Sequence, residues 1–210
     1  MFVKICGITR SQDAHAAVEA GARAVGFVFW RHSPRFIDPY RAREIVATLP
    51  PFVTSVGVFV DQPLEYVSGV ASLVRLAAVQ LHGGETPEYA AALGRPVIKA
   101  LALEQLSDVQ VGDLWESRHA ILLDVLDPVK RGGTGRTIDW AQAAAIVARR
   151  RTLLAGGLTP ENVGAAIARV QPFGIDVSSG VERAPGVKDH GRLKALFEAI
   201  HAISHVAARP

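Results

Sequence analysis

The stretch MFVKICGITR, residues 1–10, sets the pattern that the rest of the chain repeats. Its apolar and β-favouring side chains predict a short buried strand over Phe2–Cys6. Gly7 then permits the backbone angles of a tight turn. The only cysteine of the chain, Cys6, therefore ends a strand, and parallel-strand folds collect their chemistry at such ends. A small buried hydrophobic side chain is the alternative interpretation of this cysteine.

Apolar runs alternate with helix-like stretches along the whole chain. The predicted strands are Phe2–Cys6, Ala24–Phe29, Thr54–Val60, Ala77–Leu81, Val97–Leu101, Ala120–Asp124, Thr152–Ala155 and Gly174–Ser178. The predicted helices are Ser11–Ala20, Pro39–Leu49, Leu64–Ser72, Pro87–Leu93, a weaker stretch near Glu104–Leu114, Trp140–Arg150, Pro160–Val170 and Asp189–Ser204. Apolar strands that are each followed by a helix indicate a parallel sheet covered on its outside. Eight such units favour an α/β fold, a single (β/α)₈ TIM-barrel domain over residues 1–210, rather than an open doubly wound sheet.

The composition fits one enzyme-sized domain. Hydrophobic residues make up 49% of the chain, and a single cysteine excludes an internal disulfide. We find no signal-type segment and no apolar stretch long enough to cross a bilayer, so we expect a soluble, cytoplasmic protein without a membrane partner. The 23 basic and 20 acidic residues are interspersed, which argues against a nucleic-acid partner.

A closed barrel would bring the strand ends and the loops that follow them to one mouth. Asp124 ends an apolar strand, where the pKa of a carboxyl group rises and suits a general acid. A loop-capping aspartate is the alternative. Asp127 lies nearby but precedes Pro128 in a loop, and is the poorer candidate. The other groups expected at the mouth are Cys6, Arg35, Asp61, His82, Gly156-Gly157 and Ser178-Ser179-Gly180.

Glycine-containing turns follow the seventh and eighth predicted strands. Gly156-Gly157 opens the helix predicted from Pro160, and Ser179-Gly180 forms a similar turn after the next strand. Backbone N–H groups at these two positions are the usual phosphate site of a TIM barrel. Asp176, inside the eighth strand, is then an acceptor for a substrate hydroxyl or a buried anchor for neighbouring loops.

Two lysines and a histidine could also have roles in the chemistry of the site. Lys4 lies two residues before Cys6, on the same face of the strand, where its charge would depress the pKa of the thiol. Lys4 and Lys99 also leave open a Schiff-base aldolase, which needs a desolvated lysine. The Gly83-Gly84 turn would place His82 near the rim of the mouth, in a supporting or structural role.

The remaining features concern metals and a loop. The seven histidines are scattered and lack zinc-ligand spacing, so we expect no metal. The glycine-dense loop at residues 130–136 is either a lid that closes over a ligand or a plain connection.

Eight motifs, in order and in register from residue 2 to about residue 200, resemble the phosphoribosylanthranilate isomerase family of tryptophan biosynthesis. They are Lys4-Ile5-Cys6-Gly7-Ile8-Thr9, Ser33-Pro34-Arg35, Val56-Gly57-Val58-Phe59-Val60, Gln80-Leu81-His82-Gly83, Leu123-Asp124, Gly132-Gly133-Thr134-Gly135, Leu154-Ala155-Gly156-Gly157-Leu158 and Asp176-Val177-Ser178-Ser179-Gly180-Val181-Glu182.

The resemblance implies a (β/α)₈ barrel that converts N-(5-phosphoribosyl)anthranilate to 1-(2-carboxyphenylamino)-1-deoxyribulose 5-phosphate, with neither cofactor nor metal. In that family the cysteine ending the first strand is the general base and the aspartate ending the sixth is the general acid. These roles fall on Cys6 and Asp124. The family's second-loop arginine, which holds the anthranilate carboxylate, matches Arg35.

The remaining contacts with the small-molecule substrate follow from the same comparison. The family's phosphate turns match Gly156-Gly157 and Ser179-Gly180, and we expect His82 and Asp176 to contact the substrate as well. The oligomeric state stays open between monomer and homodimer. The competing hypotheses are the aldolase, a non-catalytic module that binds a phosphorylated ligand, and the bifunctional histidine/tryptophan-pathway barrel. The last resembles an aspartate-pair enzyme, whereas a cysteine ends the first strand here.

Overall fold

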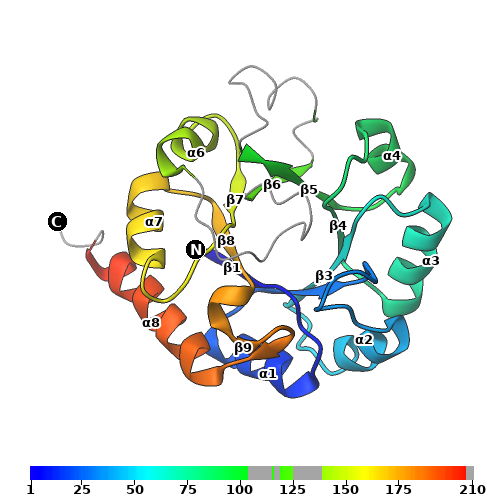
Figure 1. Ribbon diagram of the computed structural model, residues 1–210, viewed down its shortest axis with the longest axis horizontal. Helices are drawn as coiled ribbons and strands as arrows, with labels where there is room; N and C mark the ends of the chain where they lie inside the picture. Colours follow the sequence, from blue (N-terminus) through cyan, green and yellow to red (C-terminus); the bar gives the residue numbers. More distant parts are fainter. Residues whose placement is uncertain (104–114, 116–118, 125–138, 207–210) are drawn as a thin grey trace.

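The protein is a closed barrel of parallel strands inside a ring of helices (Figure 1). The computed structural model describes residues 1–103, 115, 119–124 and 139–206. Strands β1 to β8 follow one another around the barrel in chain order. The barrel closes where β1 (Phe2–Ile5) pairs with β8 (Gly174–Val177). The predicted (β/α)₈ TIM barrel is confirmed.

The strands lie within one residue of the predicted bounds at every end. The other six are β2 (Ala24–Val28), β3 (Thr54–Phe59), β4 (Ala78–Leu81), β5 (Val97–Ala102), β6 (Ala120–Asp124) and β7 (Thr152–Leu154). Each is buried on the barrel side and on the helix side, which is why its sequence is almost continuously apolar.

The helices begin and end on residues suited to those positions. Asp38 caps the first turn of α2 by accepting a hydrogen bond from the N–H of Tyr40, and Pro39 occupies the first position of the helix. Gly21 ends α1 in a left-handed conformation, with φ of 118°. The helix predicted near Glu104–Leu114 lies outside the described residues. The described helices are α1 (Ser11–Ala20), α2 (Pro39–Val46), α3 (Leu64–Val74), α4 (Pro87–Ala92), α6 (Trp140–Val147), α7 (Val163–Val170) and α8 (His190–Val206).

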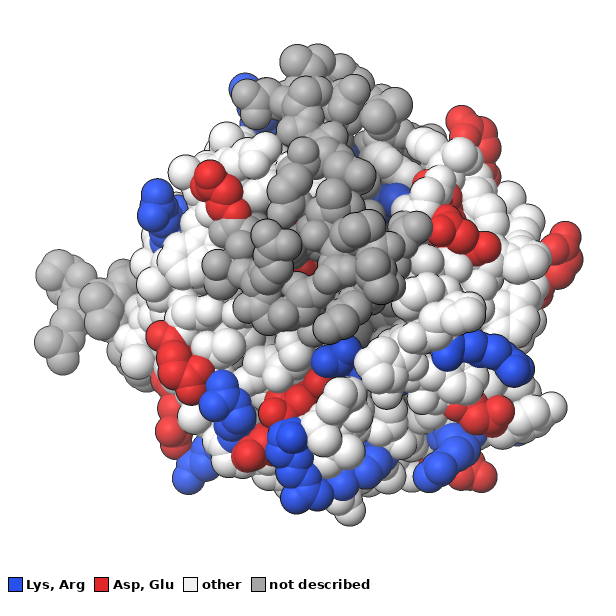
Figure 2. Space-filling view, viewed as in Figure 1, with Lys and Arg blue, Asp and Glu red and all other residues white. Residues whose placement is uncertain are grey.

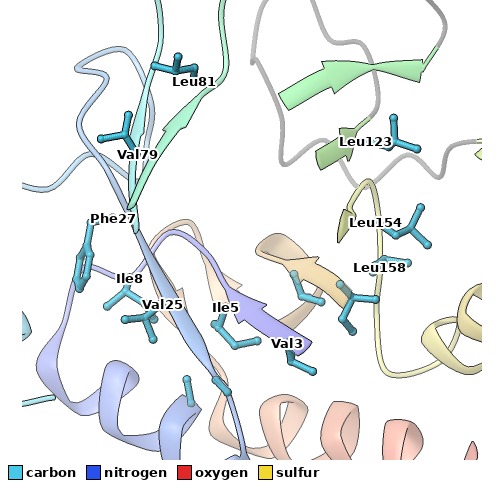
Figure 3. Close-up of a cluster of buried hydrophobic side chains, with 14 of the residues drawn as sticks. Val3, Ile5, Ile8, Val25, Phe27, Val79, Leu81, Leu123, Leu154 and Leu158 are labelled. Atoms are coloured by element: carbon cyan, nitrogen blue, oxygen red, sulfur yellow. The ribbon is translucent and has the colours of Figure 1, made fainter. Parts of the chain in front are cut away.

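The core has two layers that the alternation of side chains along each strand separates. The larger layer lies between the barrel and the helices and is drawn in part in Figure 3, with Val3 and Ile5 from β1 beside Val25 and Phe27 from β2. A smaller cluster fills the barrel interior and includes Ala24, Val56, Ala78, Ile98 and Leu122. A residue next to an outward-facing one on a strand therefore points into the barrel.

A short antiparallel hairpin between β8 and α8 was not among the predicted elements. The 3₁₀ helix η2 (Ser179–Val181) leads into β9 (Glu182–Ala184), which pairs with β10 (Val187–Lys188). The hairpin is fastened to the loop after β1, because Thr9 donates a hydrogen bond from its hydroxyl to the carbonyl of Gly186. The hairpin thus packs against the loop that follows the first strand.

The surface mixes charges of both signs. On the face drawn in Figure 2, basic and acidic side chains are interspersed around the rim of the barrel. Within the described ranges, no helix combines the length and the apolar character needed to cross a bilayer.

Candidate active site

The strand alternation brings the predicted acid and base to the inside of the barrel. On β1, Val3 and Ile5 pack outward, so Lys4 and Cys6 point inward. On β6, Leu123 packs outward and its neighbour Asp124 points inward. Because both strands run parallel, these groups gather at the carboxyl end of the barrel, where enzymes of this architecture have their sites.

Cys6 is a free, buried thiol in a partly apolar corner of the mouth. Its side chain packs with Val28 and Val58, and the partly buried ring of Trp30 lies against this group. The thiol is thus shielded from bulk water while 8% of the residue remains exposed. A group in this position can reach a ligand only from the mouth.

The backbone and the neighbouring strand fix where the thiol lies. The Cys6 N–H donates to the carbonyl of Val177 at 2.8 Å, and the Cys6 carbonyl accepts from the Ser178 hydroxyl at 3.2 Å. Gly26 of β2 leaves the space that the side chain occupies, since a Cβ on it would lie 2.8 Å from Sγ. Gly26 was not singled out from the sequence, although a glycine inside a strand marks a close approach.

The charges around Cys6 act in opposite directions. Burial raises the pKa of the thiol, and the Lys4 ammonium lowers it by less, so the pKa of Cys6 lies above its ordinary value. The expected lowering of this pKa by Lys4 is thus present, but burial outweighs it. Burial also lowers the pKa of Lys4, but the charges and hydrogen bonds of Asp176 and Cys6 together outweigh it, and the pKa of Lys4 is raised. Lys4 is consequently a permanent cation beneath the thiol.

Asp176 is the ionic partner of Lys4 across the closure of the barrel. Its Oδ1 lies 2.9 Å from Lys4 Nζ, and the lysine side chain is fully buried. Of the two predicted roles, this contact matches the buried anchor. Among the described residues nothing donates to Oδ2 of Asp176, so that oxygen keeps the capacity to accept a substrate hydroxyl.

Asp124 has His82 beside it in the mouth. His82 Nε2 lies 3.5 Å from Asp124 Oδ2, and both side chains are largely buried. Gln80 Nε2 lies 3.0 Å from His82 Nδ1; with the amide donating there, the proton of the neutral ring is on Nε2, facing the carboxylate. His82 thus faces the predicted acid rather than standing apart at the rim.

Arg35 meets a carboxylate of the protein itself. Its Nε lies 3.0 Å from Glu182 Oε1, and its Nη2 lies 2.7 Å from Glu182 Oε2. A Cβ on Gly7 would lie only 2.7 Å from Arg35 Cδ, so the arginine stem runs closely past the turn after Cys6. Glu182 carried no role in the sequence prediction, because its partner is 147 residues away.

The two predicted phosphate turns pack directly against each other. Gly156 and Gly157 have positive φ of 85° and 60°, which favours glycine at both, and neither N–H has an acceptor among the described residues. A Cβ on Gly180 would lie 1.8 Å from the carbonyl oxygen of Leu158. The turns therefore form one backbone surface, on which the Gly156 and Gly157 N–H groups have no acceptor within the described ranges.

The helices start later than predicted around these turns. Helix α7 begins at Val163 and not at Pro160, because the Asn162 side chain accepts from Thr159 N–H and donates to the Gly157 carbonyl, which closes a separate turn. After the eighth strand the chain forms η2 and the β9–β10 hairpin before α8 begins at His190.

Lys99 points away from the barrel interior. Its neighbour Ile98 fills the barrel interior, so Lys99 points toward the helix layer, where it pairs with Glu85 at 2.8 Å and donates to the Gly83 carbonyl. Asp61 belongs to the same rim structure, since its carboxylate accepts from Gly84 N–H. The Schiff-base hypothesis loses one of its two lysines by this placement.

Some predicted features are not part of this geometry. Asp127 and the candidate lid at residues 130–136 lie outside the described residues. Within the part of the chain that the structure describes, no three His, Cys, Asp or Glu side chains are grouped so that they could hold a metal ion.

A TIM barrel with a thiol, two carboxylates and an imidazole at its carboxyl end has the architecture of a barrel enzyme. Residues 3–199 match the model of the N-(5'-phosphoribosyl)anthranilate (PRA) isomerase family. The chain belongs to this family, and the family's members are isomerases.

Known relatives cover nearly the whole chain. The N-(5'-phosphoribosyl)anthranilate isomerase of Pelobacter propionicus is 48% identical over 195 residues, 93% of each chain. The crystal structure of phosphoribosyl anthranilate isomerase from Thermus thermophilus is 46% identical, covers 97% of this chain and 100% of that one, and superposes with a TM-score of 0.89. A phosphoribosyl anthranilate isomerase in complex with reduced 1-(o-carboxyphenylamino)-1-deoxyribulose 5-phosphate is 41% identical, with a TM-score of 0.81 over 96% and 99% of the two chains.

Proposed function

We propose that this protein isomerises N-(5-phosphoribosyl)anthranilate to 1-(2-carboxyphenylamino)-1-deoxyribulose 5-phosphate, the third step of tryptophan synthesis from chorismate, with Cys6 as base and Asp124 as acid. Membership of the isomerase family supports the reaction. The observation that carries the assignment of roles is the inward placement of a thiol at the end of β1 and of a carboxyl group at the end of β6.

The first step opens the ribose ring. Neutral Asp124 delivers its proton to the ring oxygen as the bond between that oxygen and C1′ breaks, and the nitrogen lone pair forms an iminium with C1′. His82 Nε2–H, next to Oδ2, then stabilises the carboxylate that Asp124 becomes. The imidazole thereby favours the charge that develops during the step.

The second step moves the C2′ proton. The iminium acidifies this proton, and the Cys6 thiolate removes it to give an enolamine, which tautomerises to the ketone. The positive charges of the iminium and of Lys4 both favour the thiolate against the burial that opposes it. The thiolate form is therefore most populated when the intermediate that needs it is present.

Two anchors hold the substrate across the mouth. The backbone N–H groups of the Gly156-Gly157 and Ser179-Gly180 turns receive the phosphate, and Arg35 receives the anthranilate carboxylate. Strands β7 and β8, which carry the phosphate turns, lie between β6 with the acid and β1 with the base. A substrate fixed there has its sugar between the two proton-transfer groups, which lowers the entropy cost of both steps.

The test is the loss of anthranilate-type fluorescence with phosphoribosylanthranilate generated in situ. The wild type should turn over, while Cys6→Ser and Asp124→Asn should each lose activity by orders of magnitude. Asp38→Asn, an exposed helix cap that asparagine fills equally well, is the matched control and should keep full activity. A wild type that binds phosphorylated ligands but does not turn over would return the protein to the non-catalytic binding module.

We also propose that the protein is a cytoplasmic homodimer. The Thermotoga maritima phosphoribosylanthranilate isomerase, a monomeric form of which is 40% identical with a TM-score of 0.81, is described as dimeric. Phe52, 95% exposed between α2 and β3, offers an apolar side chain that a second copy could cover. Light scattering of the purified protein and fractionation of the host cell test the two statements.

A further inference from the structure

The guanidinium of Arg35 is arranged to hold two carboxylates at once. Its Nε–H and one Nη2–H are engaged by Glu182 in a forked contact. Among the described residues nothing accepts a hydrogen bond from Nη1. The opposite edge, made by Nη1–H and the second Nη2–H, therefore has no acceptor in the part of the chain that the structure describes, and it matches the spacing of a second carboxylate.

Glu182 is itself held firmly, so it can define where the arginine lies. Lys188 Nζ donates to its Oε1 at 2.8 Å, and the N–H of Gly186 donates to the same oxygen at 3.2 Å. Burial raises the pKa of Glu182, but the hydrogen bonds and charges of Arg35 and Lys188 outweigh it and lower the pKa. Glu182 is thus an ionised, nearly buried group between two cations.

The burial of Lys188 leaves Arg35 as the cation of this group that a ligand can reach. Glu182 is the one anion paired with Arg35 or Lys188 among the described residues. Burial lowers the pKa of Lys188, and the charge and hydrogen bond of Glu182 oppose this only in part. Lys188 also donates to the Ser178 carbonyl at 3.1 Å, and its side chain is fully buried. Arg35 is therefore the member of this group that can offer a positive charge to a ligand in the mouth.

The contact between Arg35 and Glu182 also links Arg35 to the base and to the phosphate turn. The stem of Arg35 passes Gly7, directly after Cys6. Glu182 directly follows η2, the turn proposed for the phosphate. The Arg35–Glu182 contact consequently fixes the distance between the free edge of the guanidinium, the base and the phosphate turn.

We propose that Glu182 is a positioning residue that, together with Lys188, aims the free edge of Arg35 and so determines specificity for a substrate whose aryl group carries an ortho carboxylate. The inference rests on the proposed function, in which Arg35 binds that carboxylate. Glu182 acts through Arg35 and does not contact the substrate.

The experiment compares two substrates made in situ from ribose 5-phosphate, one with anthranilate and one with aniline, which lacks the carboxylate. Product formation is followed by liquid chromatography and mass spectrometry. In the wild type kcat/KM should favour the anthranilate substrate. Glu182→Gln keeps the shape of the side chain but replaces one acceptor by a donor opposite Nη2, and should reduce this preference about tenfold or more, mainly through KM.

Three comparisons separate positioning from general damage. A merely structural role would lower kcat/KM for both substrates equally, and that result, or an unchanged preference, overturns the proposal. In an Arg35→Ala background Glu182→Gln should leave the preference where Arg35→Ala alone puts it. Should Glu182→Gln fail to fold, Glu182→Asp decides, since a shortened carboxylate must give an intermediate preference and a wild-type preference would refute the role. A wild type inactive on both substrates refutes the proposed function instead.

Discussion

Gly180→Ala tests whether the two glycine turns form the phosphate site. The added Cβ would lie 1.8 Å from the carbonyl oxygen of Leu158, whereas real Cβ contacts essentially never fall below 3.0 Å. The partner atom is backbone, so no side chain can rotate away and the turns must separate by about 1.2 Å. A misplacement of about 1 Å can cost on the order of 100-fold in rate. We expect kcat/KM to fall by about that factor, mainly through a higher KM.

The assay is steady-state turnover of phosphoribosylanthranilate, with inorganic phosphate as a competitive inhibitor that reports on the turns directly. Phosphate inhibition should weaken in parallel with the rise in KM. Gly164→Ala is the matched control, because its Cβ would meet Ile203 Cδ1 at an ordinary 3.6 Å on the same side of the barrel. It should leave kinetics unchanged and, as a helix position, should stabilise the fold by about 0.5–1 kcal/mol. A Gly180→Ala enzyme with wild-type KM and wild-type phosphate inhibition would show that the phosphate binds elsewhere.

Two further predictions concern charge. Burial raises the pKa of Asp13, but hydrogen bonds from Arg10, His190 and the Lys188 N–H outweigh it and hold the pKa below its ordinary value. The contribution of Asp13 to stability is therefore present above the unfolded pKa of about 3.9 and is lost as the pH falls through the lower folded value. Urea unfolding between about pH 5 and pH 2 should thus show a shallower loss of stability in Asp13→Asn than in the wild type, and equal slopes would contradict the assignment. Lys4→Met removes the cation that lowers the pKa of Cys6, so the rise of kcat/KM with pH should move to higher pH. An unmoved pH profile would show that Lys4 does not act on the base.

The barrel could be predicted from the sequence because its strands are buried on two sides. That burial demands nearly continuous apolar runs, and a run such as Ala120–Asp124 is recovered with both ends correct. The same regularity extends to the site. Because side chains alternate and parallel strands end together, Cys6 and Asp124 could be placed at one mouth from their position at strand ends.

The partners of these groups could not be predicted in the same way. Lys4 and Asp176 are separated by 172 residues, and Arg35 and Glu182 by 147, so no local pattern connects them. The direction of the pKa shift of Cys6 could not be predicted from the sequence either. The charge of Lys4 two residues away is visible in the sequence, but the burial that outweighs it depends on groups from β2, β3 and β8 that meet only in the folded protein.

Three polar contacts around the base lie at or near the seam between the first and last strands. Lys4 with Asp176, the Ser178 hydroxyl with the Cys6 carbonyl, and Arg35 with Glu182 each join the beginning of the chain to its end. The acid has its partner elsewhere in the sequence. Asp124 ends β6 and lies beside His82, which directly follows β4, so both residues come from the middle of the chain. The partners of Lys4 and Arg35 around the thiol are therefore supplied by the end of the chain, whereas the acid and its histidine come from its middle. The pairing of β1 with β8 therefore brings together the charged groups that surround the base.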